Sequence, residues 1–437
     1  MSGVLVIGGG FAGVEAAFRL AKAGVPVRLA EMKPQKFSPA HTSPLLAELV
    51  CSNSFKATRI TSASGMLKAE MALLGSVCVE TAKACSVPAG GALAVDREEF
   101  ARLITEKVEN EPLITLERRE VTEIPAHGTV IVAAGPLASD ALAESISALC
   151  GGQLSFFDAA APIVTAESID RDFAFSQSRY DRGGEDDYIN CPMNKEEYEA
   201  FYRELIHAES AELHAFDRKK DFYEGCMPVE VMAARGLDTI RFGPLRPVGL
   251  RDPKTGHRPW AVLQLRREDA AGRLFNLVGF QTNLKFGEQK RVFGMIPALK
   301  NAEYARYGVM HRNTFINSPR LLDAGFAFKA RPGLFFAGQL TGVEGYMESA
   351  ASGILAGINA ARFVNGLEPL ILPAESMLGA LANYISAPCV KDFQPMGANF
   401  GILPPLDTQI RDKKQRYEAL AQRGIEAVKL QTSDFRL

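Results

Sequence analysis

The segment Val4-Leu-Val-Ile-Gly8-Gly-Gly10-Phe-Ala-Gly13 opens the chain, and Glu31 closes the next apolar run, which begins at Val27. Four apolar residues before a glycine turn predict a buried parallel strand that leads into a helix. Gly8 permits the tight turn, Gly10 lets a pyrophosphate approach the backbone, and Gly13 lets the helix pack on the strand. A carboxylate about 20 residues further on accepts a hydrogen bond from a ribose. We therefore expect a dinucleotide site formed by Gly8, Gly9, Gly10, Phe11, Ala12, Gly13 and Glu31; the alternative is a turn that only packs a helix.

A second glycine-rich region lies near the other end of the chain. Gly333-Leu-Phe-Phe-Ala-Gly338 predicts a strand that ends in a glycine turn, and a helix rich in small residues follows Tyr346. The chain has a single GxGxxG motif, and its two glycine regions are far apart. This split arrangement favours FAD over NAD, because an isoalloxazine ring lies far from its adenine and needs a C-terminal contribution. Gly338 and Tyr346 are the candidate cofactor residues there, although Tyr346 could also be an ordinary packed aromatic.

The length of 437 residues predicts two or three domains. Near Ile163 the chain changes to Gly, Pro, basic and aromatic residues with alternating strands, and it predicts one helix, Lys195–His207. We expect an α/β protein whose Rossmann-type FAD-binding domain comprises residues 1–162 and 311–437. A mostly antiparallel α/β domain would be inserted at 163–310. Within the first domain, Asp96 predicts a helix cap and 121–124 a strand.

Positive charge is concentrated in one segment. Residues 235–300 contain 13 Lys and Arg against five Asp and Glu, although the whole chain has a formal net charge of −2. A local basic patch is typical of a surface that binds nucleic acid or another phosphate-rich ligand, and the alternative is an ordinary solvated surface. The candidate RNA contacts are Arg246, Arg251, Arg266 and Arg267.

The chain has seven cysteines and no CxxC pair. An odd number without that spacing argues against a disulfide framework, a zinc site and a dithiol reductase, so we expect no metal. The first apolar stretch lacks a basic flank and ends in glycines, and no apolar run is long enough to span a bilayer. We therefore expect no membrane association and a cytoplasmic location.

Several longer motifs resemble the folate- and FAD-dependent tRNA (uracil-5-)-methyltransferases, the TrmFO family, which is related to the MnmG or GidA flavoproteins. The resemblance extends from residue 4 to about residue 406. The motifs that carry it are Gly8–Gly13, Glu48-Leu-Val-Cys51-Ser-Asn-Ser54, Val87–Arg97, Asn190-Cys-Pro-Met193, Cys226-Met-Pro-Val-Glu230, Arg306–Asn313 and Gly342-Val-Glu-Gly-Tyr346-Met-Glu-Ser-Ala350.

The resemblance implies that methylenetetrahydrofolate donates a one-carbon unit to C5 of the T-loop uridine at tRNA position 54, that reduced FAD takes part, and that NAD(P)H re-reduces the flavin. It also maps two functional cysteines onto Cys51 and Cys226. We expect Cys226, beside the basic segment, to attack uracil C6, because nearby cations favour a thiolate. Cys51 would then act in C5 deprotonation or in handling the one-carbon unit, although the two roles could be exchanged.

Three other interpretations remain at this point: a wobble-uridine tRNA-modifying flavoprotein, a generic flavin oxidoreductase, and a non-catalytic flavin-dependent sensor that binds RNA. The length of the chain argues against the first, and the basic segment against the second. A sensor would not need two loop thiols. The sequence leaves open the oligomeric state, the choice between NADH and NADPH, the order of the cysteine roles and how the target uridine is exposed.

Overall fold

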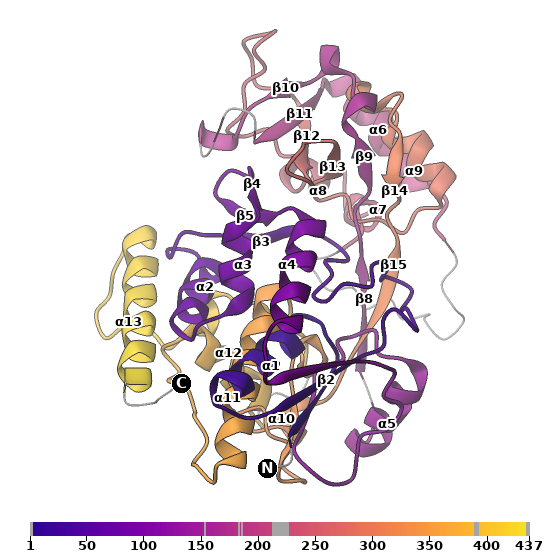
Figure 1. Cartoon of the computed structure of the whole chain (residues 1–437). Helices are drawn as coiled ribbons and strands as arrows, with labels where there is room; N and C mark the ends of the chain where they lie inside the picture. The colour runs from indigo at the N-terminus through magenta and orange to yellow at the C-terminus, as the bar shows by residue number, and fades with distance from the viewer. Residues whose placement is uncertain are drawn as a thin grey trace.

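The computed structural model describes residues 3–152, 154–181, 184, 187–211, 227–388 and 393–433. The protein has a lower part built on a parallel sheet and an upper part built on an antiparallel sheet (Figure 1). Two strands run between them, β8 (Leu154–Ala159) and β15 (Met310–Phe315), and they pair antiparallel along their length. The α/β class with an inserted, antiparallel second domain is therefore confirmed.

The lower sheet has the order β16-β7-β1-β2-β6, and each neighbouring pair is parallel. Its strands are β1 (Val4–Ile7), β2 (Val27–Glu31), β6 (Ile114–Arg118), β7 (Val130–Val132) and β16 (Leu334–Phe336). The first and last glycine regions thus end strands of one sheet, as expected. The strand expected at 121–124 is absent, because this short segment leads into Pro125 and irregular chain instead of pairing with the sheet.

Helix α1 (Phe11–Lys22) packs closely against α11 (Tyr346–Val364). Small residues make this approach possible: a Cβ atom on Gly353 would lie 2.1 Å from the carbonyl oxygen of Ala12. The acidic cap is confirmed, since Asp96 accepts a hydrogen bond from the Glu99 amide at the start of α4 (Arg97–Glu109). The small-residue helix therefore binds the N-terminal unit to the C-terminal half of the chain.

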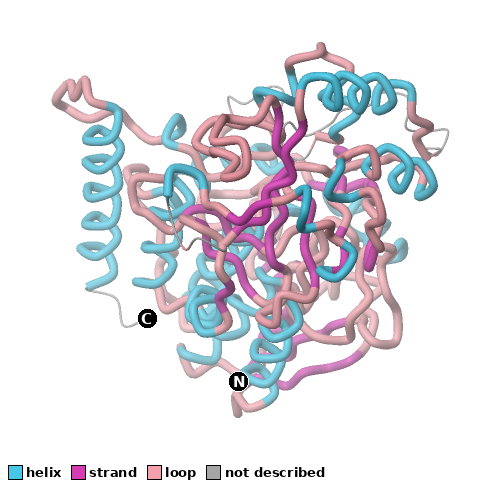
Figure 2. The backbone as a smooth tube through the Cα atoms, turned by 90° about the horizontal axis from the view of Figure 1, so that it is seen from above, coloured by secondary structure: helices cyan, strands magenta, loops and turns pink. Residues whose placement is uncertain are grey.

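Further elements complete the lower part. A small sheet has the order β3-β5-β4, and the C-terminal helix packs against α2 along one face and lies at the edge of the molecule (Figure 2). These elements are α2 (Ala63–Leu73), α3 (Val77–Ala84), α5 (Asp140–Cys150), α10 (Ser318–Leu321), α12 (Met377–Ser386), α13 (Lys413–Ser433), β3 (Ser54–Ala57), β4 (Ser86–Val87) and β5 (Ala92–Val95).

The upper sheet has the order β10-β11-β12-β13-β9-β14 and is antiparallel throughout. Side chains along each of its strands alternate between the two faces of the sheet. Leu263 and Leu265 of β12, and Phe275 and Leu277 of β13, belong to a separate hydrophobic core, so the residues between them point to the other face. The strands are β9 (Ile163–Thr165), β10 (Phe175–Ser176), β11 (Tyr188–Met193), β12 (Ala261–Arg267), β13 (Leu274–Leu277) and β14 (Tyr304–Arg306).

The expected helix in this part is present as α6 (Lys195–His207) and begins with a capping box between Asn194 and Glu197. The sequence did not predict α7 (Val229–Ala233), α8 (Thr239–Phe242) or α9 (Phe286–Phe293). The first two span only five and four residues, which is too short for a helical period to be visible.

Candidate active site

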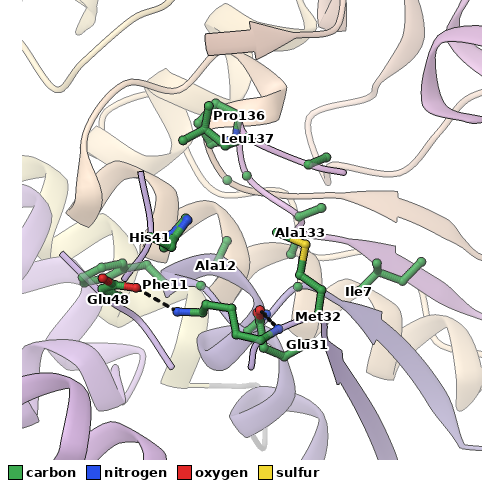
Figure 3. Close-up of a pocket in the computed structure, with 18 of the residues that line it drawn as sticks. Ile7, Phe11, Ala12, Glu31, Met32, His41, Glu48, Ala133, Pro136 and Leu137 are labelled. Carbon is green, nitrogen blue, oxygen red and sulfur yellow. Dashed lines mark hydrogen bonds and ion pairs between the residues drawn. The ribbon is translucent and has the colours of Figure 1, made fainter. Parts of the chain in front are cut away.

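A groove lies at the carboxyl ends of β1, β2 and β7, where the sheet order reverses direction around β1. This is the position at which open α/β sheets bind ligands. The groove spans about 1060 Å³, a volume that includes space open to solvent. In Figure 3, Pro136 and Leu137 lie across the groove from Glu31 and Glu48.

The glycine turn has the geometry that a pyrophosphate requires. Gly8 has φ of +105°, and a Cβ atom there would lie 2.5 Å from the carbonyl oxygen of Ala133. A Cβ atom on Gly13 would lie 1.8 Å from the carbonyl oxygen of Gly8. A Cβ atom on Gly10 would meet nothing within 4 Å, and α1 begins at the next residue. The open space therefore lies at a helix N-terminus, which attracts phosphate.

Glu31 organises the groove from the end of β2. One carboxylate oxygen accepts a hydrogen bond from the Gly9 amide at 2.7 Å, and the other accepts one from the Lys33 amide at 2.9 Å. A carboxylate has about four acceptor positions, so Glu31 can accept a further bond from a ribose hydroxyl. The residues at this end of the groove therefore fit an adenosine diphosphate moiety.

The loop after β2 forms another wall of the groove, a role that the sequence did not reveal. Lys33 and Glu48 form a buried ion pair at 3.1 Å, and Glu48 also accepts hydrogen bonds from the amides of Thr42 and Ser43. His41 lines the groove beside them (Figure 3), and burial together with the charge of Lys33 lowers the pKa of its imidazole. We expect a neutral His41 that can hydrogen-bond to a ligand.

A second cavity adjoins the groove, and together with the solvent-open space at its mouth it spans about 1540 Å³. Residues of the lower part line one side, and Arg266, Asn276 and Gln281 of the upper part line another. The groove and the cavity share Val50, Pro136, Leu137, Gln339, Tyr346 and Ser349. A ligand bound along the groove would therefore reach a chamber that both parts of the protein enclose.

Cys51 and Tyr346 meet at this junction. The Cys51 sulfur lies 3.1 Å from the Tyr346 hydroxyl oxygen, which also accepts hydrogen bonds from the amides of Val50 and Cys51 at 2.9 Å each. Burial, together with the negative charge of a Cys51 thiolate, raises the pKa of Tyr346 well above its usual value. The hydroxyl therefore stays protonated and can donate a hydrogen bond to the Cys51 sulfur.

Arginines surround the Cys51 loop. Arg97 donates to the carbonyl oxygen of Leu49 and forms an ion pair with Glu268, and Arg266 donates to Ser52 and Asn53 at 2.9 Å each. The charges of Arg97, Arg266 and Arg306 all act on Cys51. Such a positive environment favours a thiolate.

The other described cysteines have surroundings of the opposite kind. Burial raises the thiol pKa of Cys85 and Cys150 to about 11 and that of Cys191 to about 12, and it also raises that of Cys78. These thiols stay protonated. Cys226, the second predicted catalytic residue, lies outside the described residues.

The four predicted RNA-binding arginines occupy different environments. Arg246 and Arg251 are exposed, whereas Arg267 is partly buried. Arg266 is only 7% exposed, and it lines the cavity and binds the Cys51 loop. Its location in an alternating strand explains the difference, since its side chain points to the cavity face of the sheet.

Metal-ligand clusters and membrane-spanning helices are both absent from the described ranges. No group of three or more His, Cys, Asp or Glu residues is placed to hold a metal ion there. No helix in the described part of the chain is long and apolar enough to cross a membrane.

The groove and the cavity together define a two-domain, dinucleotide-binding α/β protein with a cysteine where its two sites meet. The family model described as "Glucose inhibited division protein A" matches residues 3–368. Relatives named "Methylenetetrahydrofolate--tRNA-(uracil-5-)-methyltransferase TrmFO" are similar over almost their whole length. The protein from Listeria innocua serovar 6a is 59% identical over 98% of both chains, and that from Moorella thermoacetica is 58% identical over 97% of both. The chain therefore belongs to the GidA family and, within it, to the TrmFO proteins.

A solved structure supports the fold. The Aquifex aeolicus GidA structure in its form II crystal matches 99% of this chain and 74% of its own chain, with a TM-score of 0.70 and 17% identity. At this identity the likeness concerns the fold alone.

Proposed function

We propose that this protein methylates C5 of the T-loop uridine at position 54 of tRNA, with 5,10-methylenetetrahydrofolate as the carbon donor and FAD as the redox cofactor. The observation that carries the proposal is the position of Cys51, at the junction of a dinucleotide groove and a large cavity. Cys51 lines this cavity, and the whole chain is 59% identical to a TrmFO protein over 98% of both lengths. A cytoplasmic location follows from this substrate.

The groove residues would hold FAD. The open space at Gly10 and the N-terminus of α1 suit the pyrophosphate, and Glu31 suits the adenosine ribose. Gly338 lines the groove, and Tyr346 lies where the groove reaches the cavity. When bound and reduced, the flavin supplies the electrons that convert a methylene carbon to a methyl group. NAD(P)H is the proposed source of these electrons.

The chain itself supplies thiol chemistry. Uracil C5 is a poor nucleophile, and addition of a thiolate at C6 makes C5 nucleophilic. We assign this addition to Cys226 and the removal of the C5 proton, or the handling of the one-carbon unit, to Cys51. The positive environment from Arg97 and Arg266 supports a thiolate at Cys51, and the protonated hydroxyl of Tyr346 can stabilise it.

The test is an anaerobic incubation of the purified holoenzyme with methylenetetrahydrofolate labelled in its one-carbon unit, NADPH or NADH, and an unmodified tRNA transcript. Label at C5 of uridine 54 is expected, and a transcript with cytidine at position 54 is the matched control. Label that is absent, or that appears equally in both transcripts, would refute the proposal.

The cysteine roles need a separate test. A transcript with 5-fluorouridine at position 54 has no C5 proton to lose, so a covalent protein–RNA adduct should accumulate. Cys226→Ala should abolish the adduct, whereas Cys51→Ala should abolish methylation and retain the adduct. The opposite result would show that the two roles are exchanged.

A further inference from the structure

Polar residues of the inserted sheet form part of the upper wall of the cavity. Arg266 of β12 pairs directly with Asn276 of β13, and both line the cavity. Their sequence neighbours, Leu265, Phe275 and Leu277, point into the core on the other side. Side chains that lie opposite each other on one face of an antiparallel pair are close neighbours. Arg266 and Asn276 therefore form adjacent polar groups on this wall.

These neighbouring polar groups differ in how their hydrogen bonds are satisfied. Arg266 donates to Ser52 and Asn53, and Gln264, on the same face, bonds to Asn190 and Arg179. Asn276 is 3% exposed, and its side-chain nitrogen has no hydrogen-bond partner anywhere in the described ranges. Folded proteins leave few buried donors unsatisfied, and a missing ligand is one explanation.

We propose that Asn276 recognises the target uracil by hydrogen-bonding to the edge that carries N3–H and a carbonyl oxygen. The proposal rests on the function proposed above and assigns a substrate contact within it. An asparagine amide offers a donor and an acceptor side by side, which complement a carbonyl oxygen and an adjacent N–H. The same cavity contains Cys51, so a base held there lies within the chamber that carries the reactive thiol.

Flavin and pterin rings also have amide-like edges, and the location of Asn276 on the inserted domain favours uracil. Asn276 lines the cavity but not the groove formed by Gly8–Ala12 and Gly338. It lies on the inserted domain, which also carries the exposed Arg246 and Arg251 of the basic segment. A base that enters with tRNA bound to this domain would meet the Asn276 wall.

The first test compares Asn276→Asp with the wild-type holoenzyme. A carboxylate is an acceptor only, so it repels the uracil carbonyl and suits the amino group of cytosine. We expect kcat/KM for the uridine-54 transcript to fall at least about 10-fold, because a buried polar group loses its partner. The preference for uridine-54 over cytidine-54 transcripts in competition binding should fall by a similar factor. Asn301→Asp adds the same charge at an exposed position of the same domain and should change neither quantity.

The second test uses Asn276→Ala and a transcript with 3-methyluridine at position 54, which blocks the N3–H edge. The methyl group should lower kcat/KM at least about 10-fold with the wild-type enzyme. With Asn276→Ala it should have almost no further effect, because the interaction is already absent. This comparison of two enzymes with two transcripts does not use the aspartate variant, so it stays informative if that variant fails to fold.

Three outcomes would overturn the proposal. The aspartate and alanine variants could keep wild-type kcat/KM and base preference. The defect could instead appear as an altered flavin spectrum or flavin content, which would assign Asn276 to the flavin. It could also be confined to the KM for methylenetetrahydrofolate, which would assign it to the pterin. Failure of the function proposed above is distinguishable, since the wild-type enzyme would then not label uridine 54 at all.

Discussion

The ion pair between Arg97 and Glu268 connects the Cys51 loop to both parts of the protein, and replacing Arg97 with methionine tests this connection. Arg97 lies at the start of α4, and its guanidinium donates to Glu268 at 2.8 and 3.0 Å and to the carbonyl oxygen of Leu49. The Glu268 side chain is 3% exposed, and its second carboxylate oxygen has no partner among the residues that the structure describes. Arg97→Met would therefore leave a buried carboxylate without its main partner.

Removing one member of a buried ion pair costs about 3–5 kcal/mol of unfolding free energy, chiefly because the remaining charge is uncompensated. Arg97→Met should lower stability by that amount in urea unfolding followed by circular dichroism. The double variant Arg97→Met/Glu268→Gln should recover most of the loss, since it leaves no buried charge. Because Leu49 lies two residues before Cys51, the single variant should also slow alkylation of the Cys51 thiol and reduce methylation.

Arg102 provides a matched control in the same helix. Its ion pairs with Glu99 and Glu106 are exposed, and such pairs contribute little to stability. Arg102→Met should therefore leave unfolding, thiol alkylation and methylation unchanged. A cost below about 1 kcal/mol for Arg97→Met, or a double variant as unstable as the single one, would refute a stabilising buried ion pair at this position.

Three further predictions concern other parts of the molecule. Gly10→Val should abolish flavin retention on gel filtration while the apoprotein remains folded, because the added side chain occupies only the groove; retained flavin would contradict the proposed pyrophosphate site. Arg246→Glu and Arg251→Glu should weaken tRNA binding and flatten its salt dependence in filter binding, with flavin content unchanged; unaltered affinity would make these arginines ordinary surface residues. Burial raises the pKa of Glu70 from 4.5 to about 7, so the fold favours its protonated form. The protonated Glu70 side chain then makes its full contribution to the unfolding free energy below pH 4.5. This contribution declines by about 3 kcal/mol as pH rises to about 7. Glu70→Gln should remove that decline from urea unfolding measured across this pH range, and an identical decline in the variant would refute the assignment.

The sequence by itself determined the features that depend on short-range patterns. The glycine turn, α1 and Glu31 all lie within one βαβ unit, whose turn and register are set by a few adjacent residues. Helix α6 matched its expected bounds because Asn194 and Glu197 form a capping box next to its first residue. The functional role of Cys51 was predicted from a motif resemblance and not from the chemistry of the residues around it in the sequence.

Only the tertiary structure decided which of these residues meet. The Cys51 sulfur and the Tyr346 hydroxyl are 295 positions apart in the chain, and Arg97 and Glu268 are 171 apart. Arg266 looked like a surface cation within a basic segment, yet strand alternation and domain packing bury it beside the Cys51 loop. Asn276 carried no signal at all in the sequence. Its unsatisfied amide has meaning only because the two parts of the protein enclose the cavity that it lines. Side-chain neighbours of that kind are set by long-range packing and not by local pattern.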